Sequence, residues 1–220
     1  DRLGPDVAMV LDVPVALPAP RDRVRRAMER TLRWAERAQA VHRRPDQALF
    51  GIVQGGTDPE MRAESAAATA ALGFAGFRIG GLAGWETPEE RHQALEAAVA
   101  ALPPGRVRYV MGLGDTEGVL AAVGQGCDLF DCVWPTRLAR HGKVLSARGD
   151  YSVRRAELAE AREPIDPDCP CLACRRYSLG YLRHLRVTDE LLGMRLLSLH
   201  NLTYTLGLLE GARRAVAAGE

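Results

Sequence analysis

One acidic residue, Asp131, lies in an apolar segment directly before a cluster of basic residues. The segment 129–134 contains mainly the residue types of a buried strand, and Pro135 would end this strand because it cannot donate to a ladder. A basic loop is expected next, with Arg137, Arg140 and Lys143. An ionised carboxylate in such a strand costs free energy unless it has a function or a partner. Because three basic residues follow within twelve residues, we expect the molecule that meets Asp131 to carry negative charge nearby, although an Asp that only caps the next turn has the same pattern.

Three cysteines and a distant histidine have the spacing of a metal site. Cys169, Cys171 and Cys174 lie within six residues, and His200 follows Cys174 by twenty-six residues, in a later predicted helix. Three thiols and an imidazole are the ligands of a closed, tetrahedral zinc site, whose role would be structural because no position is left open. Such a site would join a helix at about 176–185 to the helix that carries His200. His184 is an alternative fourth ligand, and three cysteines that are merely packed in the interior are another alternative.

Three further residues have groups that suit a purine, and all three lie where predicted strands end. The carboxylate of Asp12 offers two acceptors to the adjacent N–H donors of guanine's Watson–Crick edge. Gln54, or the backbone N–H of Gly81, could donate to guanine O6. The alternatives are a loop cap at Asp12 and a tight turn at Gly80 and Gly81.

The elements that would position these residues form a repeating pattern. Strands are expected at 6–13, 48–55, 76–82, 107–112 and around Asp131, and helices follow them. The first helix covers about 21–41 and the fourth about 116–123, whereas Thr57 and Thr87 each begin a capping box with a proline just inside the helix. Strands that are apolar on both faces and alternate with helices predict a parallel sheet covered by helices.

The placement of the unusual residues favours one α/β architecture. They follow the carboxyl ends of strands, which is where (β/α)8 barrels of the TIM type hold their active sites. Only about five or six of the eight units can be found, so we expect a partial barrel; a doubly wound open sheet is the alternative. We assign 1–143 to this barrel, with the pocket and the nucleophile. The residues 144–220 would form a zinc-binding subdomain with barrel-closing helices, short strands at 144–146 and 151–153, and a short helix at 154–162.

Charge is distributed unevenly along the chain. Residues 1–136 carry 15 basic and 18 acidic side chains, whereas residues 137–186 carry 11 and 6, so an anion would be met in the second region. No apolar run reaches membrane-spanning length and the start lacks the features of a signal peptide, so we expect a cytoplasmic protein. Five cysteines, an odd number, fit a metal site better than a disulfide framework.

Together, these motifs resemble those of a known family. Phe-Asp-Cys-Val at 130–133, Pro-Thr-Arg at 135–137, Arg140, Gly-Gly-Leu-Ala at 80–83 and the Cys-x-Cys-x-x-Cys motif with His200 resemble tRNA-guanine transglycosylase, also called queuine tRNA-ribosyltransferase, of the bacterial type. The resemblance extends over the whole chain and corresponds to the C-terminal part of that family's chain. It implies a pentosyltransferase that exchanges guanine at the anticodon wobble position of tRNA for a 7-deazaguanine, in a zinc-containing barrel.

The resemblance also implies roles for individual residues. Asp131 would be the nucleophile that forms a covalent bond to ribose, and the zinc ligands would be the four residues named above. The base would be held by Asp12, Gln54 and Gly81, with Met111 as a wall of the pocket. The segments that would contact RNA contain Gly112, Leu113, Gly114, Asp115, Thr116, Glu117 and Gly118, and then Thr136, Arg137, Leu138, Ala139 and Arg140.

Some positions depart from the family's pattern. Its other catalytic aspartate and a base-stacking aromatic residue belong to a segment upstream of Asp1. Val13 and Pro14 stand where Glu-Cys is usual, and Gly84 and Trp85 stand where Val-Gly is usual, which leaves the incoming base, preQ1 or queuine, open. A non-catalytic tRNA-binding partner subunit, an inactive fragment and a barrel enzyme acting on a small phosphorylated metabolite remain alternatives.

A stripe of side chains suggests self-association. Tyr177, Tyr181 and His184 would share one face of a helix next to the zinc ligands, with arginines around them. Packing of this face against the barrel is the alternative. The resemblance implies a homodimer with aromatic residues in its contact, so we expect a homodimer.

Overall fold

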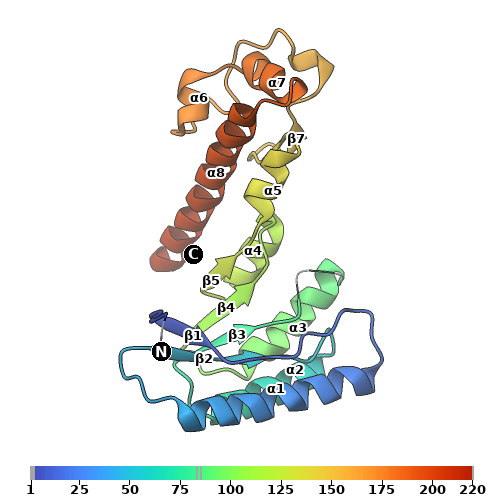
Figure 1. Ribbon diagram of the computed structural model, residues 1–220, viewed down its shortest axis with the longest axis vertical. Helices are drawn as coiled ribbons and strands as arrows, with labels where there is room; N and C mark the ends of the chain where they lie inside the picture. The colour runs from blue at the N-terminus through green and yellow to red at the C-terminus, as the bar shows by residue number, and fades with distance from the viewer. Residues whose placement is uncertain (1–2, 83, 85, 220) are drawn as a thin grey trace. The chain divides into compact units, whose positions relative to one another are not determined.

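The computed structural model describes residues 3–82, 84 and 86–219 and divides into two compact units, Asp1–Asp131 and Cys132–Glu220. Figure 1 shows the elements of both, coloured along the chain. Ala83 and Trp85, which the sequence comparison with the family used, lie outside the described residues.

Unit 1 is built on a parallel sheet whose strands follow one another in chain order. The strands pair in the order β1-β2-β3-β4-β5 and are β1 Val7–Met9, β2 Ala48–Val53, β3 Gly76–Ile79, β4 Val107–Met111 and β5 Leu129–Asp131. The helices between them are α1 Arg21–Val41, α2 Pro59–Ala71, α3 Pro88–Ala100 and α4 Thr116–Gly124. A doubly wound sheet would reverse its strand order at a switch point, which this sheet does not do.

The chain order makes unit 1 part of a (β/α) barrel. Right-handed crossovers between successive neighbours put every helix on the same face of the sheet, and α1 packs on α2, α2 on α3 and α3 on α4. Within the described residues the sheet has five strands, so the prediction of a partial barrel is confirmed. The opposite face is the one that would line the interior of the barrel.

The helices of unit 1 begin as the sequence predicted, with one correction. The Thr87 hydroxyl accepts from the Glu90 N–H while the Glu90 carboxylate accepts from the Thr87 N–H, which is the predicted capping box. In α2 the cap is Asp58, whose carboxylate accepts from the Met61 N–H; the prediction of a capping box that starts at Thr57 was wrong. Asp58 directly precedes Pro59, which leaves the cap position to Asp58.

The segment after Asp131 is a helix, whereas the sequence suggested a strand that runs into a basic loop. Strand β5 ends at Asp131, and α5, Trp134–Arg140, begins before Pro135. Proline has no N–H to donate, but a residue in the first turn of a helix needs none, so Pro135 starts this helix instead of ending a strand. Arg137 and Arg140 consequently lie in the last turn of α5.

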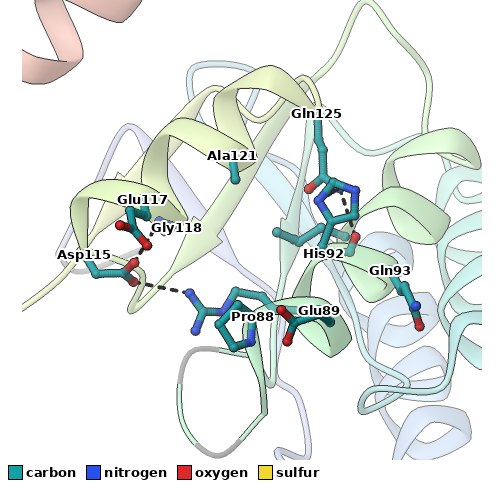
Figure 2. A pocket seen from close by; sticks show the side chains of 11 residues that line it. Pro88, Glu89, His92, Gln93, Asp115, Glu117, Gly118, Ala121 and Gln125 are labelled. Carbon is teal, nitrogen blue, oxygen red and sulfur yellow. Dashed lines mark hydrogen bonds and ion pairs between the residues drawn. The ribbon is translucent and has the colours of Figure 1, made fainter.

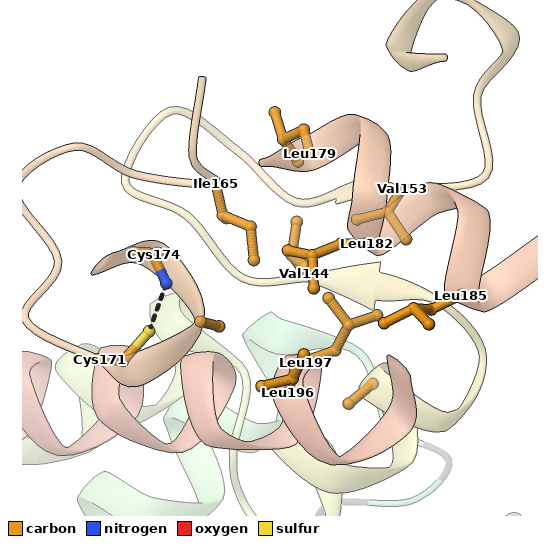
Figure 3. Packing of buried hydrophobic residues seen from close by; sticks show 12 residues of the cluster. Val144, Val153, Ile165, Cys171, Cys174, Leu179, Leu182, Leu185, Leu196 and Leu197 are labelled. Carbon is orange, nitrogen blue, oxygen red and sulfur yellow. Dashed lines mark hydrogen bonds between the residues drawn. The ribbon is translucent and has the colours of Figure 1, made fainter. Parts of the chain in front are cut away.

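Unit 2 packs several short elements on one long helix. The pair β6 Lys143–Val144 and β7 Tyr151–Ser152 is antiparallel, and the helices are α6 Leu172–Arg176, α7 Leu179–Val187 and α8 Leu191–Ala218. Between β7 and α6 only a 3₁₀ turn, Ala156–Leu158, forms where a helix at 154–162 was predicted. Figure 3 shows the core, in which Val144, Val153, Leu182 and Leu197 are fully buried.

Unit 2 includes α5, so the compact units divide after Asp131, whereas the sequence placed the domain boundary after Lys143. The buried Asn201 of α8 explains this, because its side-chain N–H groups donate to the carbonyls of Pro135 and Lys143 at 2.9 and 3.1 Å. The Arg186 guanidinium also donates to the Arg140 carbonyl at 3.0 Å. Among the described residues, no helix has both the length and the apolar character needed to cross a membrane.

Candidate functional site

The residues proposed from the sequence to hold a purine lie together at the carboxyl ends of β1, β2 and β3. The Gln54 amide N–H donates to Asp12 Oδ2 at 2.7 Å, and Gln54 is 4% exposed. Gly81 has a φ of +71°, and a Cβ there would lie 2.6 Å from Gln54 Oε1. A side chain at Gly81 would therefore both strain the backbone and displace the amide of Gln54.

Arg78, which the sequence analysis did not single out, joins this group. Its guanidinium lies 3.4 Å from Asp12 Oδ2, and both side chains are largely buried. Phe77 and Ile79, its neighbours in β3, are almost fully buried, and successive strand residues point to opposite faces. A charged residue inside the four-residue strand β3 was the signal that could have found it.

The carboxylate of Asp131 accepts hydrogen bonds from two donors, one in β4 and one in the residue that follows β4. Oδ1 accepts from the Tyr109 hydroxyl at 2.8 Å and from the Gly112 N–H at 3.2 Å. Burial, and then the hydrogen bond to Asp131, raise the pKa of Tyr109 to about 12. The phenol therefore stays a donor at neutral pH, and the carboxylate remains exposed in this chain. Met111, the predicted pocket wall, pairs directly with Asp131 in the β4–β5 ladder.

The two groups share one face of the sheet. Arg78 of β3 pairs with Tyr109 of β4 in the parallel ladder, so their side chains point to the same side. Arg78 contacts Asp12, and Tyr109 contacts Asp131. The Asp12 group, expected from the sequence to hold a base, and the exposed carboxylate of Asp131 thus lie along one edge of the sheet, at strand ends, as in barrel active sites.

The segment 112–118 comprises the loop from β4 to α4 and the first residues of α4, and Asp115 holds it. Its carboxylate caps α4 by accepting from the Gly118 N–H at 2.7 Å, and it pairs with Arg91 of α3 at 3.2 Å. Figure 2 shows Asp115 at one end of a pocket lined by residues of α3 and α4, with His92 and Gln125 at the other end. Leu113 is 2% exposed, so at this position any contact with RNA would involve the backbone.

The basic side chains after Asp131 project from α5. Arg137 and Arg140 are exposed, whereas Ala139 between them is fully buried in unit 2. The Thr136 hydroxyl donates to the Val133 carbonyl at 3.2 Å and so stabilises the first turn. The helix presents two arginines in one turn to solvent, and Lys143 follows in β6.

The three cysteines and His200 form a group suited to a metal ion. Their ligand atoms all lie within 4.8 Å of one another, and His200 Nδ1 is 3.2 Å from Cys174 Sγ and 3.7 Å from Cys171 Sγ. Figure 3 shows the Cys174 N–H donating to Cys171 Sγ, at 3.4 Å, at the start of α6. The metal would join α6 to α8, not the helix predicted at 176–185, because that segment divides into the end of α6 and the separate helix α7.

The surroundings of His200 fit a metal ligand. Its Nε2 lies 2.9 Å from the Leu145 carbonyl, which fixes the proton on Nε2 and leaves the lone pair of Nδ1 facing the sulfurs. Burial lowers the pKa of His200 and raises the pKa values of the Cys169 and Cys174 thiols. A divalent cation would stabilise the thiolates that burial disfavours. His184, the alternative ligand, is exposed and does not belong to the group.

The whole chain is similar in sequence to known proteins of one family. A family model described as queuine tRNA-ribosyltransferase matches residues 1–220. The chain is 49% identical over 220 residues to a queuine tRNA-ribosyltransferase of Symbiobacterium thermophilum, covering 100% of this chain and 55% of the relative. Proteins of the same name from Moorella thermoacetica and Thermus thermophilus are 45% and 44% identical over 219 residues, covering 100% of this chain and 59% and 57% of theirs.

Proposed function

We propose that this chain carries the base pocket and the nucleophile of a tRNA-guanine transglycosylase, because it belongs to the queuine tRNA-ribosyltransferase family. The chain spans 55 to 59% of the length of the three relatives, so the activity is proposed for the protein that contains it. The observation that best supports this proposal is that the groups around Asp12 and Asp131 lie on one face of the sheet. The reaction exchanges guanine at the wobble position of tRNA for a 7-deazaguanine.

The chemistry follows from the position of Asp131. A carboxylate oxygen attacks C1′ of the ribose while the bond from C1′ to guanine N9 breaks, and guanine leaves with the bonding electrons and takes up a proton. The ribose is then held as an ester. The N9 of the incoming base, after losing its proton, attacks C1′ and releases the carboxylate. Tyr109 and the Gly112 N–H hold Oδ1, which leaves Oδ2 for the attack.

The base would be held by the Asp12 group. Asp12 would accept from the N–H donors of the Watson–Crick edge, and Gln54 or the Gly81 N–H would donate to O6. In the described structure Asp12 Oδ2 already accepts from Gln54, with Arg78 alongside. An incoming base would therefore replace Gln54 and Arg78 as hydrogen-bond partners of the Asp12 carboxylate, which these side chains hold in position. Gly84 lacks the side chain usual in the family, so the choice between preQ1 and queuine depends on this loop.

Replacing Asp12 with alanine should weaken binding of the base. The loss of a carboxylate that pairs with two donors costs about 1 to 3 kcal/mol, or roughly 5- to 150-fold in affinity. The dissociation constant of guanine for the full-length variant, measured by calorimetry, tests this. Thr31, whose hydroxyl accepts from the Val13 N–H at 3.0 Å, provides a control: Thr31→Ala removes a bond beside Asp12 without touching the carboxylate. Unchanged guanine affinity in Asp12→Ala would refute the pocket.

The RNA would be bound by the exposed basic side chains that follow the nucleophile in the chain. Arg137 and Arg140 of α5, together with Lys143, would bind anticodon phosphates or bases while the wobble nucleotide is turned out of the stack. The segment 112–118 would make further contacts. Such binding weakens steeply with salt, and its substrate would place the protein in the cytoplasm.

A zinc ion would fill the site of Cys169, Cys171, Cys174 and His200. It supplies a structural cross-link when bound, because all its coordination positions are occupied by the protein. The side chains then tie α6, the loop before it and α8 into one unit, with Leu145 fixing His200.

We also propose a homodimer that uses the aromatic side chains of unit 2. Tyr177 lies outside α7, so a single helical face does not explain the stripe, but its ring stacks on Tyr181 with centroids 5.4 Å apart. Tyr181 is 40% exposed, and His184 is exposed beside it. Tyrosines with arginines around them are favoured at interfaces.

Changing Tyr177 and Tyr181 together to alanine should convert the dimer into monomers at low micromolar concentration. Removal of two stacked aromatic anchors costs interface energy that the arginines around them do not replace. Sedimentation of the full-length protein measures the change. Tyr204→Ala in α8 is the matched control. A double variant that remains dimeric would show that this face is not the interface.

A further inference from the structure

Unit 1 contains an arginine that is completely buried behind the proposed base pocket. Arg62 of α2 is 0% exposed, and its Nε donates to the Gly56 carbonyl at 2.6 Å. Its Nη1 donates to the Gly80 carbonyl at 2.7 Å and to the Val53 carbonyl at 3.3 Å. One rigid guanidinium thus joins the carboxyl ends of two neighbouring strands and the loop that follows the first.

These carbonyls belong to the residues next to the groups proposed to hold O6. Val53 directly precedes Gln54, and Gly80 directly precedes Gly81. Arg62 Nη2 also lies 3.8 Å from the position that a Cβ of Gly81 would take. The guanidinium thus binds the carbonyls of the two peptide groups whose N–H groups belong to Gln54 and Gly81. The hydroxyl of Ser65, one turn along α2, accepts from the Gln54 N–H at 3.1 Å and supports the same strand end.

A buried cation is an expensive way to join two strands. Its Nε and Nη1 donate to carbonyl oxygens, and Nη2 has no hydrogen-bond partner among the described residues. Burial lowers the pKa of Arg62 to about 9, partly offset by the negative charge of Glu86. Apolar packing would cost less if cohesion were the only need. The planar fork of Arg62, by contrast, fixes directions as well as distances, which a lysine ammonium cannot do.

We propose that Arg62 is a positioning residue for base recognition, which sets the spacing of Gln54 and Gly81 by binding the carbonyls of Val53, Gly56 and Gly80. The inference rests on the proposed function, since it concerns the same base site. It predicts that small changes at Arg62 affect the binding of the base more than the binding of tRNA or the chemical step.

The test is Arg62→Lys in the full-length protein, with Arg62→Met as the more severe change. The lysine keeps the charge and can satisfy some of the carbonyls but loses the fork, so KM for guanine should rise about tenfold, the effect of one lost hydrogen bond. KM for tRNA and kcat should stay within about twofold. Calorimetry with guanine measures the same change without turnover, and Arg62→Met should weaken binding further than Arg62→Lys.

Arg108 provides the matched control, because it is another arginine of unit 1 that donates to carbonyls, those of Gly126 and Leu102, both at 3.2 Å. It lies near the amino end of β4, away from the pocket. Arg108→Lys should lower the melting temperature without changing guanine affinity.

The outcomes separate the two proposals. A wild-type protein that neither exchanges nor binds guanine would remove the proposed function, and this inference with it. An active wild type whose Arg62→Lys variant melts earlier, or fails to fold, without a selective loss of guanine affinity would show that Arg62 only holds the fold. A selective rise in KM for guanine, absent from Arg108→Lys, would establish the positioning role.

Discussion

Replacing Asp131 with asparagine in the full-length protein should abolish base exchange while tRNA binding stays within a few fold. An amide does not form the ester that holds the ribose, and loss of a nucleophile lowers kcat on the order of 10⁴-fold or more. Asparagine keeps the shape of the side chain, so the contacts with Tyr109 and Gly112 can persist. Exchange of labelled guanine into tRNA measures the loss, and a denaturing gel tests for the covalent RNA adduct.

Asp128 offers a matched carboxylate just before the same strand. Its Oδ2 accepts from the Arg108 N–H at 2.8 Å, so Asp128→Asn changes the same functional group away from the proposed pocket. This variant should retain exchange and form the adduct. Substantial exchange by Asp131→Asn, or an adduct in that variant, would show that another residue is the nucleophile. Tight tRNA binding without any adduct in the wild type would instead favour a non-catalytic partner subunit.

Removing the metal should destabilise unit 2 strongly. We expect one zinc per chain, and its removal by a chelator, or its loss in Cys174→Ser, should lower the melting temperature by at least about 10 °C. A metal at this site would join α6 to α8, and without it the cluster would have only weak sulfur contacts around a buried imidazole. Elemental analysis and calorimetric melting of the same preparations provide the two measurements.

Two variants outside the cluster serve as controls for the metal. Cys127→Ala removes a buried thiol of unit 1, and His184→Ala removes the exposed imidazole that the sequence allowed as a ligand. Both should keep one zinc per chain. A zinc-free preparation with the same melting temperature as the metal-bound protein would exclude the structural role. Loss of zinc from His184→Ala would contradict the proposed set of ligands.

Local patterns in the sequence were enough to predict most elements of unit 1 and the metal group. Apolar strands and capped helices depend on neighbours in the chain, so α1 and the capping box at Thr87 could be predicted. The strand ends also indicated that Asp12, Gln54 and Gly81 would meet, because carboxyl ends of neighbouring parallel strands share one edge.

The tertiary structure decided what depends on contacts between distant residues. Only packing placed His200, and not His184, opposite the cysteines, since a spacing does not say which face of a helix is buried. Only the ladder brought Arg78 beside Tyr109 and so connected the pocket to Asp131. From the sequence, Pro135 was compatible with either the end of a strand or the start of a helix. In the structure it lies in the first turn of α5, and its carbonyl accepts a hydrogen bond from the Asn201 side chain. The sequence thus identified the candidate site groups by type, whereas their mutual positions came from long-range hydrogen bonds that no local pattern encodes.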